Sequence, residues 1–555
     1  PPAVPSCEII HSPPGHHDHG KGVLIRVDCL LLVFQARAMS TAASLGAAVV
    51  ARRTRRVLIC CDDFKGTLSA LAAAEAVGTG VAAFLNGHLG ADVNVDCRVL
   101  PLSDGGLGFL RSLVAVDPSV VPLSLLPPSH DTLPPVVLGP LGTPLPAPAT
   151  FALSIQRRRL FIESATAIGL PLVPPERRNP MLTTTFGLGT LIRSAWQQSN
   201  AMLSAMSGHH HGACGHHPRP EEENGENVTA AVEEIVLGLG GSATSDCGIG
   251  ALQALGFAII AGGRRFGTAT TATGDGTTPP DNASSVIRGA DVCQGVESIE
   301  GLSTDTESNL RRALYGGSAG PGSAPLPKLT LVCDVTNPLV GPEGAAAVYG
   351  PQKGATPADV IRLDEGAKSV AQALNAACHV DVSHLPRAGA AGGVSGTFAA
   401  AFGARLLPGA QVFAEWCGLS EAVRGADLVI TGEGRYDQQT RSYAKTVSLV
   451  CQMCAQHGKP VVVVCGSTDG RTGSRPDVTE NRVSAFKLEG KIVPSAAFVV
   501  APLTAALAST APDPAPAVRL LPAHFALHEA MSEPAVCIAR TIERALEACP
   551  ELLSA

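Results

Sequence analysis

The stretch Ile235–Gly256, IVLGLGGSATSDCGIGALQALG, contains the pattern that decides the fold. It begins with the apolar run Ile235–Leu239, which predicts a short buried strand, and it ends with Gly250–Leu255, which predicts a helix. Between them lies Gly240–Asp246, a turn rich in glycine and hydroxyl groups that ends in a carboxylate. A strand that passes through such a turn into a helix is the repeating unit of α/β proteins, so the stretch predicts strands covered by helices.

Four other segments have the same form, an apolar strand that ends in Gly, Asp, Ser or Thr with a helix soon after. They are Asp62–Gly66 (DDFKG), Ser103–Gly106 (SDGG), Asp334–Pro338 (DVTNP) and Thr431–Asp437 (TGEGRYD). In open α/β sheets the ligand lies outside the carboxyl ends of the strands, so we expect the five loops to converge on one cleft. Turn glycines and helix caps also explain each loop taken alone. The combination of several carboxylates with one lysine favours the handling of phosphate with a divalent ion.

The composition agrees with a large α/β protein and excludes other classes. The chain has 555 residues, of which 45% are hydrophobic, 16% charged and only 4% aromatic. Cores of Ala, Val, Leu and Ile are typical of parallel strands under helices. The formal net charge of −7 argues against a nucleic-acid-binding protein that neutralises phosphates. No uninterrupted apolar run is long enough to span a membrane, and the 16 scattered cysteines favour a reducing compartment.

The residue types in the five loops predict chemical roles. Backbone N–H groups around Gly240, Gly241, Ser242 and Thr244 would wrap phosphate oxygens at a helix N-terminus. Lys65 would neutralise charge on a transferred phosphoryl group. The candidates to hold Mg²⁺ or to accept a proton from a substrate hydroxyl are the carboxylates Asp62, Asp246, Asp334, Glu433 and Asp437.

Of two standard nucleotide-binding motifs, one is absent from the chain and the other is matched in part. The chain has no GxxxxGK[ST], which excludes a P-loop kinase. Gly238–Ala243, GLGGSA, does match the dinucleotide fingerprint G-x-G-x-x-A after a strand, but the acidic residue expected about 20 residues further on is missing. Arg264 and Arg265 stand in that region instead. An NAD-dependent dehydrogenase stays open as an alternative, and so does a non-catalytic nucleotide- or metal-binding homologue.

At these loops the chain resembles the bacterial-type glycerate kinase family, which is unrelated to P-loop kinases. The matching stretches include DDFKGTLSA at Asp62–Ala70, CDVTNPLVGPEGAAAVYGPQKGA at Cys333–Ala355, AGAAGGVSG at Ala388–Gly396 and GADLVITGEGRYDQQT at Gly425–Thr440. The resemblance implies ATP-dependent phosphorylation of D-glycerate with Mg²⁺, giving 2-phosphoglycerate or 3-phosphoglycerate. It also implies two α/β domains with a cleft between them, one of them Rossmann- or flavodoxin-like, and a first domain that is discontinuous.

The resemblance guides the choice of site residues, whose individual roles are our inference. We expect Asp246 to draw the proton from the glycerate hydroxyl, Lys65 and Mg²⁺ to steady the γ-phosphate, and a basic group such as Arg178 or Arg435 to meet the substrate carboxylate. The full assignment is catalysis by Lys65, Asp246 and Asp62; substrate binding by Arg178, Asp104, Asn337 and Arg435; nucleotide binding by Gly240, Gly241, Ser242, Thr244 and Lys353; and metal binding by Asp334, Glu433 and Asp437.

The chain departs from the family's pattern at several motif positions. Asp63 stands where the family usually has Ser, Leu107 where Glu is usual, Ser245 where Asn is usual, and Cys247 where Gly is usual. The usual G-K-[TA]-P after the last motif is also missing. These departures indicate a divergent member of the family.

The motif spacing predicts the domain organisation. Residues 1–56 are expected to be an N-terminal extension, either a disordered tail or an organellar transit segment. The protein is accordingly expected in the cytoplasm, or in an organelle such as the mitochondrion or a peroxisome-like compartment. The first α/β domain would comprise 57–125 plus 385–555, and the second 126–384, with insertions at 207–227, which is rich in histidine, and at 262–328. The expected partners are D-glycerate and ATP, without nucleic acid or membrane, and a homodimer is compatible with these patterns.

Overall fold

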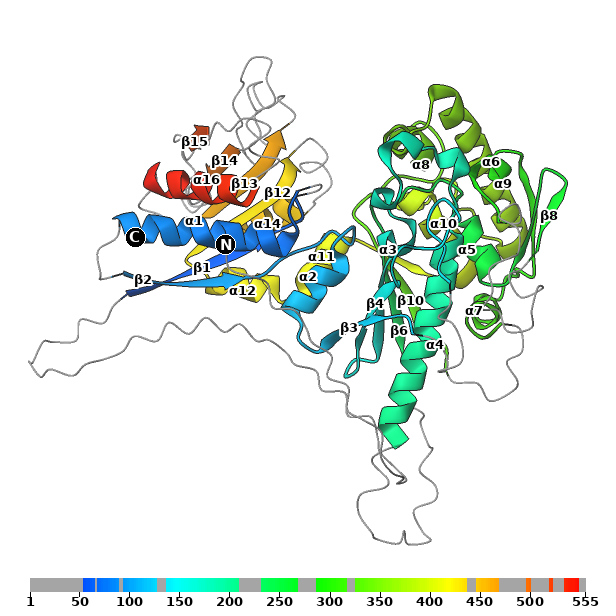
Figure 1. The fold of residues 1–555 in the computed structure, drawn as a ribbon, viewed down its shortest axis with the longest axis horizontal. Helices are drawn as coiled ribbons and strands as arrows, with labels where there is room; N and C mark the ends of the chain where they lie inside the picture. Colours follow the sequence, from blue (N-terminus) through cyan, green and yellow to red (C-terminus); the bar gives the residue numbers. More distant parts are fainter. Residues whose placement is uncertain are drawn as a thin grey trace, which may run out of the picture. The chain divides into compact units, whose positions relative to one another are not determined.

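The computed structural model describes residues 53–64, 67–88, 93–126, 136–208, 231–267, 286–316, 325–436, 446–468, 496–500, 519–522 and 534–548. Contacts divide the chain into the units Pro1–Ala51 and Arg52–Ala555, and all the described residues belong to the second unit. Its described residues form two six-stranded sheets and one three-stranded sheet, with helices packed against them (Figure 1). The predicted α/β class is therefore confirmed. None of the described helices is both long and apolar enough to cross a membrane.

The first sheet has the strand order β15-β14-β13-β12-β1-β2, so both ends of the chain contribute to it, as predicted for a discontinuous domain. Its strands are β1 (Arg53–Cys61), β2 (Val93–Val99), β12 (Leu428–Tyr436), β13 (Val461–Thr468), β14 (Ala496–Val500) and β15 (Arg519–Pro522). β2, β1, β12 and β13 are parallel, whereas β14 pairs antiparallel with both β13 and the edge strand β15. The parallel part has the flavodoxin-like order, which puts the topological switch point between β1 and β12.

Alternate residues of the first sheet pack into two cores. Val57 and Ile59 of β1 face helices α1 and α16, which lie side by side (Figure 1), whereas Leu58 and Cys60 face α12 and α14. Strands that are buried on both faces read as continuous apolar runs, and this is why they could be predicted. The helices are α1 (Ala70–His88), α12 (Leu419–Gly425), α14 (Thr446–Gln456) and α16 (Pro534–Ala548).

The second sheet has the order β11-β10-β6-β5-β4-β3. Its strands are β3 (Val120–Ser124), β4 (Thr150–Ser154), β5 (Arg159–Glu163), β6 (Glu234–Gly238), β10 (Lys328–Val332) and β11 (Arg405–Leu407). β5, β6, β10 and β11 are parallel, and β3 and β4 are antiparallel. The domain division itself stays a prediction, but β3 and β11, which fall in the predicted first domain, pair here because their backbones hydrogen-bond to β4 and β10.

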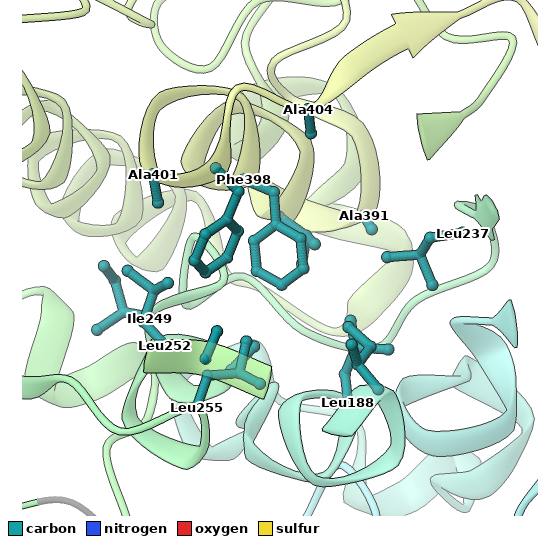
Figure 2. Packing of buried hydrophobic residues seen from close by; sticks show 14 of the residues in the cluster. Leu188, Leu237, Ile249, Leu252, Leu255, Ala391, Phe398, Ala401 and Ala404 are labelled. Atoms are coloured by element: carbon teal, nitrogen blue, oxygen red, sulfur yellow. The ribbon is translucent and has the colours of Figure 1, made fainter. Parts of the chain in front are cut away.

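The largest core packs the second sheet against helices on one face (Figure 2). Leu237 of β6 lies there with Leu188 of α4, Leu252 of α5 and Phe398 of α10. Helix α4 is longer than the predicted Thr185–Trp196. The helices around this sheet are α2 (Phe109–Val116), α3 (Ala165–Ile168), α4 (Phe186–Gly208), α5 (Ile249–Ala254), α6 (Gly289–Val292), α7 (Thr306–Tyr315), α8 (Ala345–Tyr349), α9 (Pro357–Cys378), α10 (Val394–Phe402) and α11 (Gly409–Trp416). Short 3₁₀ helices are η1 (Leu170–Leu172), η2 (Pro175–Arg177), η3 (Pro180–Leu182), η7 (Pro351–Lys353) and η8 (Ala390–Gly392).

A second core joins the two sheets. Phe109 of α2 packs against Phe161 of β5 with ring centroids 6.4 Å apart, and Trp416 of α11 packs against the same Phe161 at 5.6 Å. The same core contains Leu58 of the first sheet. Because α2 begins directly after the loop that follows β2, this packing brings the SDGG loop to the second sheet.

The stretch 262–328 is more regular than predicted. β7 (Ala258–Ala261), β8 (Arg264–Phe266) and β9 (Val296–Glu300) form an antiparallel sheet, and Phe266, Ile299 and Leu314 are buried in the core of the second sheet. The described parts on either side of 268–285 thus have regular structure, and the insertion at 262–328 stays a prediction. The Gly/Thr-rich part 268–285 and most of the histidine-rich stretch, residues 209–227, lie outside the described residues.

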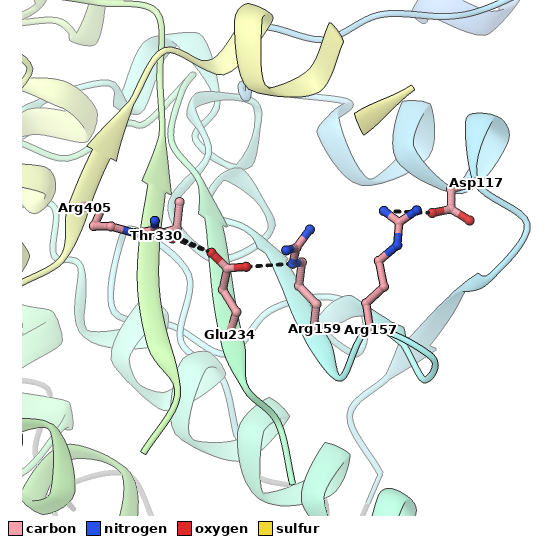
Figure 3. Close-up of polar contacts among 6 residues, drawn as sticks. All are labelled: Asp117, Arg157, Arg159, Glu234, Thr330 and Arg405. Carbon is pink, nitrogen blue, oxygen red and sulfur yellow. Dashed lines mark hydrogen bonds and ion pairs between the residues drawn. The ribbon is translucent and has the colours of Figure 1, made fainter. Parts of the chain in front are cut away.

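Glu234, the first residue of β6, ties four strands together at the amino edge of the second sheet (Figure 3). Its Oε2 pairs with Nε of Arg159 on β5 at 2.7 Å, and its Oε1 accepts hydrogen bonds from Oγ1 of Thr330 on β10 at 2.6 Å and from Nη2 of Arg405 on β11 at 2.8 Å. This edge is opposite the carboxyl ends, so the network fixes strand register without touching the loops there.

Candidate active site

The loop after β2 and the loop after β6 meet through backbone contacts. A Cβ atom at Gly240 would lie 2.6 Å from Cα of Gly106, and one at Gly105 would lie 2.8 Å from the carbonyl oxygen of Val332. Gly105 also has φ +86°, in the left-handed region that favours glycine. Two of the loops that were predicted to converge are thus in direct contact, and only glycines permit this approach.

The turn Gly240–Ser242 presents backbone donors. Gly241 has φ +62°, and both glycines reach the surface while Ser242 is buried. Within the described part of the chain the N–H groups of these three residues donate no hydrogen bond, whereas the N–H of Ala243 donates to the carbonyl of Ile168 at 2.8 Å. Consecutive unpaired N–H groups in a turn attract anions. The predicted phosphate cradle fits this turn, but the helix N-terminus predicted with it is wrong, because α5 begins only at Ile249.

Lys353 is buried beneath the turn. Its Nζ donates to Oγ of Ser242 at 3.2 Å and to the carbonyl of Thr244, and the residue is 3% exposed. Burial lowers the pKa of Lys353 to about 8, and the nearby Asp246 carboxylate opposes that shift. Lys353 therefore supports the turn from the inside, and its part in nucleotide binding stays a prediction.

Asp246 is completely buried, and both of its carboxylate oxygens are occupied. Oδ2 accepts from the N–H of Thr185 at 2.7 Å, from its hydroxyl at 2.9 Å and from the N–H of Gly250 at 3.2 Å, while Oδ1 accepts from the N–H of Gly248 at 3.3 Å. Burial raises the pKa of Asp246, and these four donors lower it. A substrate hydroxyl cannot reach a side chain that is 0% exposed, so the geometry does not fit the predicted role as proton acceptor.

Asp62, Asp104 and Asp334 follow β1, β2 and β10 and interact electrostatically, and we call these three residues the carboxylate cluster. Asp334 follows β10, and Oδ1 of Asp334 accepts from the N–H of Ala410 at 3.0 Å, whereas Oδ2 is buried with no hydrogen-bond partner among the described residues. Burial raises the pKa of Asp334 to about 7, and the negative charges of Asp104 and Asp62 add to the shift. Oδ2 of Asp62 accepts from the Thr446 hydroxyl at 2.6 Å. A bound cation would relieve this repulsion.

The unpartnered oxygen of Asp334 fits a ligand for Mg²⁺. In kinases Mg²⁺ is commonly held by one or two carboxylates together with phosphate oxygens and water. Across the described ranges no three His, Cys, Asp or Glu side chains are grouped closely enough to hold a metal by themselves. Of the other predicted metal ligands, Glu433 is half-buried on β12, directly after Gly432, whose carbonyl accepts from the N–H of Asp62 at 2.8 Å. Asp437 lies outside the described residues.

A pocket of about 440 Å³ opens between loops of the two sheets and is lined by Asp63, Thr67, Leu107, Arg111 and Glu163, among others. Oδ1 of Asp63 accepts from the N–H of Ala70 at 2.6 Å, and Glu163 accepts from the N–H groups of Gly108 and Leu110 at 3.0 and 3.2 Å. Burial raises the pKa of Glu163. A Cβ at Gly241 would lie 3.9 Å from Cβ of Leu107, so the pocket adjoins the Gly240–Ser242 turn.

The remaining predicted residues have varied surroundings. Nδ2 of Asn337 donates to the carbonyl of Glu343 at 2.7 Å and its Oδ1 accepts from the hydroxyl of Tyr349 at 2.7 Å, so this amide holds its own loop. Arg178 is half-buried, with its carbonyl against Gly354. Lys65 lies outside the described residues, between Phe64 and Thr67, and so does the side chain of Arg435 at the end of β12.

Sequence reasoning missed Arg387, Glu163 and Arg111. Nη1 of Arg387 donates to the carbonyl oxygens of Cys333 at 2.7 Å and of Val335 at 3.5 Å, on either side of Asp334. The signal that could have found it is an arginine directly before the Gly-rich motif at 388–396. Glu163 and Arg111 carry no comparable signal, because only the tertiary contacts place them beside Asp63.

The dinucleotide alternative does not fit the turn after β6. That fingerprint needs a helix that begins within the Gly-rich segment, so that the helix N-terminus faces a pyrophosphate. Here the segment continues to Gly248 before α5 begins, and Asp246 accepts from N–H groups at the start of that helix.

Comparison with known proteins identifies what the chain is similar to. The model of the glycerate kinase family matches residues 57–204, 225–273 and 324–496. A glycerate kinase of Bacillus subtilis is 34% identical over 413 residues, covering 74% of this chain and 85% of that protein. A glycerate 2-kinase of Escherichia coli is 30% identical over 421 residues, covering 75% and 87%. A crystal structure assigned as glycerate kinase 2 from Salmonella typhimurium LT2 aligns with a TM-score of 0.54 at 26% identity, covering 91% of this chain and 100% of that one.

Proposed function

Because the chain belongs to the glycerate kinase family, we propose that it transfers the γ-phosphoryl group of ATP to a hydroxyl of D-glycerate with the help of Mg²⁺. The observation that carries the proposal is the position of the SDGG loop, which links the carboxylate cluster to the Gly240–Ser242 turn. Its Asp104 belongs to the carboxylate cluster, and its Gly106 touches the Gly240–Ser242 turn. Phosphate and acceptor hydroxyl would thereby be held beside each other, which is the main requirement of phosphoryl transfer.

The Gly240–Ser242 turn would bind phosphate oxygens through its backbone N–H groups. Lys353, held against Ser242 and Thr244 from inside, adds positive potential below them. Mg²⁺ held by Asp334 would supply charge neutralisation on the phosphate oxygens. Lys65 lies between the pocket-lining residues Asp63 and Thr67 in the chain. It remains our candidate for neutralising the charge on the transferred phosphoryl group.

Within the carboxylate cluster we assign the proton acceptor to Asp104. Asp62 and Asp334 are each 8% exposed, whereas Asp104 is only half-buried. Oδ1 of Asp104 accepts from the N–H of Gly106 at 2.8 Å, which fixes the carboxylate relative to the phosphate turn. A base must reach the hydroxyl that it deprotonates, and this requirement favours Asp104 over the buried Asp246.

The test is turnover by the purified full chain with ATP, Mg²⁺ and D-glycerate, measured as ADP release. We expect turnover in the wild type and a loss of at least about 100-fold in kcat for Asp104→Asn, which keeps the shape of the side chain. Absence of ADP release from a sample with a cooperative unfolding transition would contradict the proposal and favour a non-catalytic homologue. NADH formation from NAD⁺ and D-glycerate would favour the dehydrogenase instead.

We propose 2-phosphoglycerate as the product, because the Escherichia coli relative is named a glycerate 2-kinase. Phosphorus NMR distinguishes the two products directly. A phosphate on the secondary carbon couples to one proton and gives a doublet, whereas 3-phosphoglycerate gives a triplet. A triplet as the main signal would refute this regiochemistry and leave the kinase activity standing.

A further inference from the structure

Arg387 adopts an unfavourable backbone conformation next to the carboxylate cluster. Its φ is +73°, in the left-handed region where residues other than glycine are uncommon. The conformation is fixed from both sides, because its N–H donates to the carbonyl of Thr336 at 3.1 Å and its carbonyl accepts from the Ser395 hydroxyl at 2.6 Å. Strained residues of this kind persist where the surrounding structure holds them, and they concentrate at functional sites.

The strain places the guanidinium group at the turn that carries Asp334. Nη1 donates to the carbonyls of Cys333 and Val335, which anchors one edge of the group. Nε and Nη2 donate to no oxygen among the residues that the structure describes, the guanidinium also interacts with the Cys333 thiol, and the side chain is half-buried. A guanidinium with one anchored edge and one free edge is suited to paired hydrogen bonds with a carboxylate.

We propose that the free edge of Arg387 binds the carboxylate of the substrate. The inference rests on the proposed function, since D-glycerate is a three-carbon acid whose carboxylate and hydroxyls are separated by only one or two bonds between carbons. The cation that binds the carboxylate must therefore lie beside the groups that receive the hydroxyl. Arg387 satisfies this requirement because it bonds to the turn of Asp334, which interacts with Asp104.

The test compares Arg387→Gly with Arg158→Gly. Glycine suits a positive φ, so Arg387→Gly removes the guanidinium while relaxing the backbone, and the melting temperature should change little. Arg158 is the matched control, because it also has a positive φ, +49°, but lies in the turn between β4 and β5, where its guanidinium pairs with the exposed Glu233. We expect Arg387→Gly to raise KM for D-glycerate roughly 10- to 100-fold, as for a lost hydrogen-bonded charge pair, with KM for ATP nearly unchanged. Arg158→Gly should change neither constant.

Two further measurements separate a binding role from a structural one. Arg387→Lys keeps the charge at the same φ and should recover part of the affinity for D-glycerate. D-glycerate should raise the melting temperature of the wild type but not that of Arg387→Gly. An unchanged KM for D-glycerate in Arg387→Gly, or an equal rise of both KM values, would overturn the inference. A wild type that is stabilised by D-glycerate but does not phosphorylate it would refute the proposed function, and the variants would then be judged by the shift in melting temperature.

Discussion

Several carboxylates of the site act as caps for helices. Asp63 accepts from an N–H at the start of α1, Glu163 from N–H groups at the start of α2, Asp246 at the start of α5 and Asp334 from the second residue of α11. A carboxylate there satisfies backbone donors and the positive end of the helix dipole. These four helix starts are therefore occupied by carboxylates, whereas the Gly240–Ser242 turn has the backbone donors that our proposal assigns to phosphate.

Replacing Asp246 should reduce the stability of the fold more than it reduces kcat. Asp246→Asn turns one accepting oxygen into an N–H₂ group that faces either the N–H of Gly248 or the donors of Thr185 and Gly250. We expect a loss of about 2–4 kcal/mol in the free energy of unfolding, because buried donors lose their acceptor. The measurement is urea unfolding combined with kcat corrected for the folded fraction. A stable variant without turnover would instead restore Asp246 as the proton acceptor.

The alkaline limb of the pH profile should report Lys353. Its pKa in the folded protein is lowered to about 8, so the ammonium group that supports the turn is lost as the pH rises through that value. We therefore expect KM for ATP to rise above about pH 8. In Lys353→Arg the charge persists at high pH, and the rise should move to higher pH. Identical profiles for the two proteins would contradict this role.

The lowered pKa of Lys353 has the opposite effect on stability, which should increase with pH. The folded pKa of Lys353 lies below its ordinary value of 10.5, so between about pH 8 and 10.5 the unfolded chain binds more protons at this site. The contribution of Lys353 to the free energy of unfolding therefore increases with pH across that window, and the burial cost is fully present below it. Unfolding measured at pH 7.5 and 9.5, with Lys353→Met as the reference, checks the sign.

Among the secondary-structure elements, Glu234 should stabilise the second sheet without affecting the site. Glu234→Ala removes the partner of Arg159, Thr330 and Arg405 at the amino edge, and we expect a loss of about 1–3 kcal/mol in the free energy of unfolding. Both KM values should stay unchanged, because the network lies at the opposite end from the site. Arg424→Ala, which breaks the exposed pair with Glu421, is the control and should have no measurable effect on stability.

For the whole molecule, residues 1–51 should be dispensable in vitro. The described cores and all the site residues lie after them, and contacts separate Pro1–Ala51 from the rest. A chain that starts at Arg52 should therefore keep the melting temperature, kcat and KM of the full chain. A large drop in melting temperature would show that the segment contributes to the fold. The homodimer and the cytoplasmic or organellar location stay predictions, which light scattering and fusion of residues 1–56 to a fluorescent protein would check.

The sequence predicted what depends on local pattern. Strand-to-turn segments such as Val57–Asp62 and Ile235–Gly241 were recognisable because apolar runs and turn glycines are neighbours in the chain. The burial of Asp246 was not, since it depends on Thr185, which belongs to another loop. Arg387 was missed for the same reason, because its partners lie more than 50 residues earlier in the chain. Roles assigned by residue type alone therefore fail where remote contacts decide accessibility.

The split first sheet has a consequence for how the protein is made. β1 and β2 leave the ribosome early, but β12, which pairs with β1, begins only at Leu428. At ordinary rates of translation, roughly 15 to 70 s pass between β2 and β12. During that time β1 can pair with β2 on one side but has an unpaired edge on the other, and every strand of the second sheet is synthesised in the same interval. We therefore expect the nascent chain to need protection of that edge. A chaperone that binds extended apolar segments would bind Val57–Cys61.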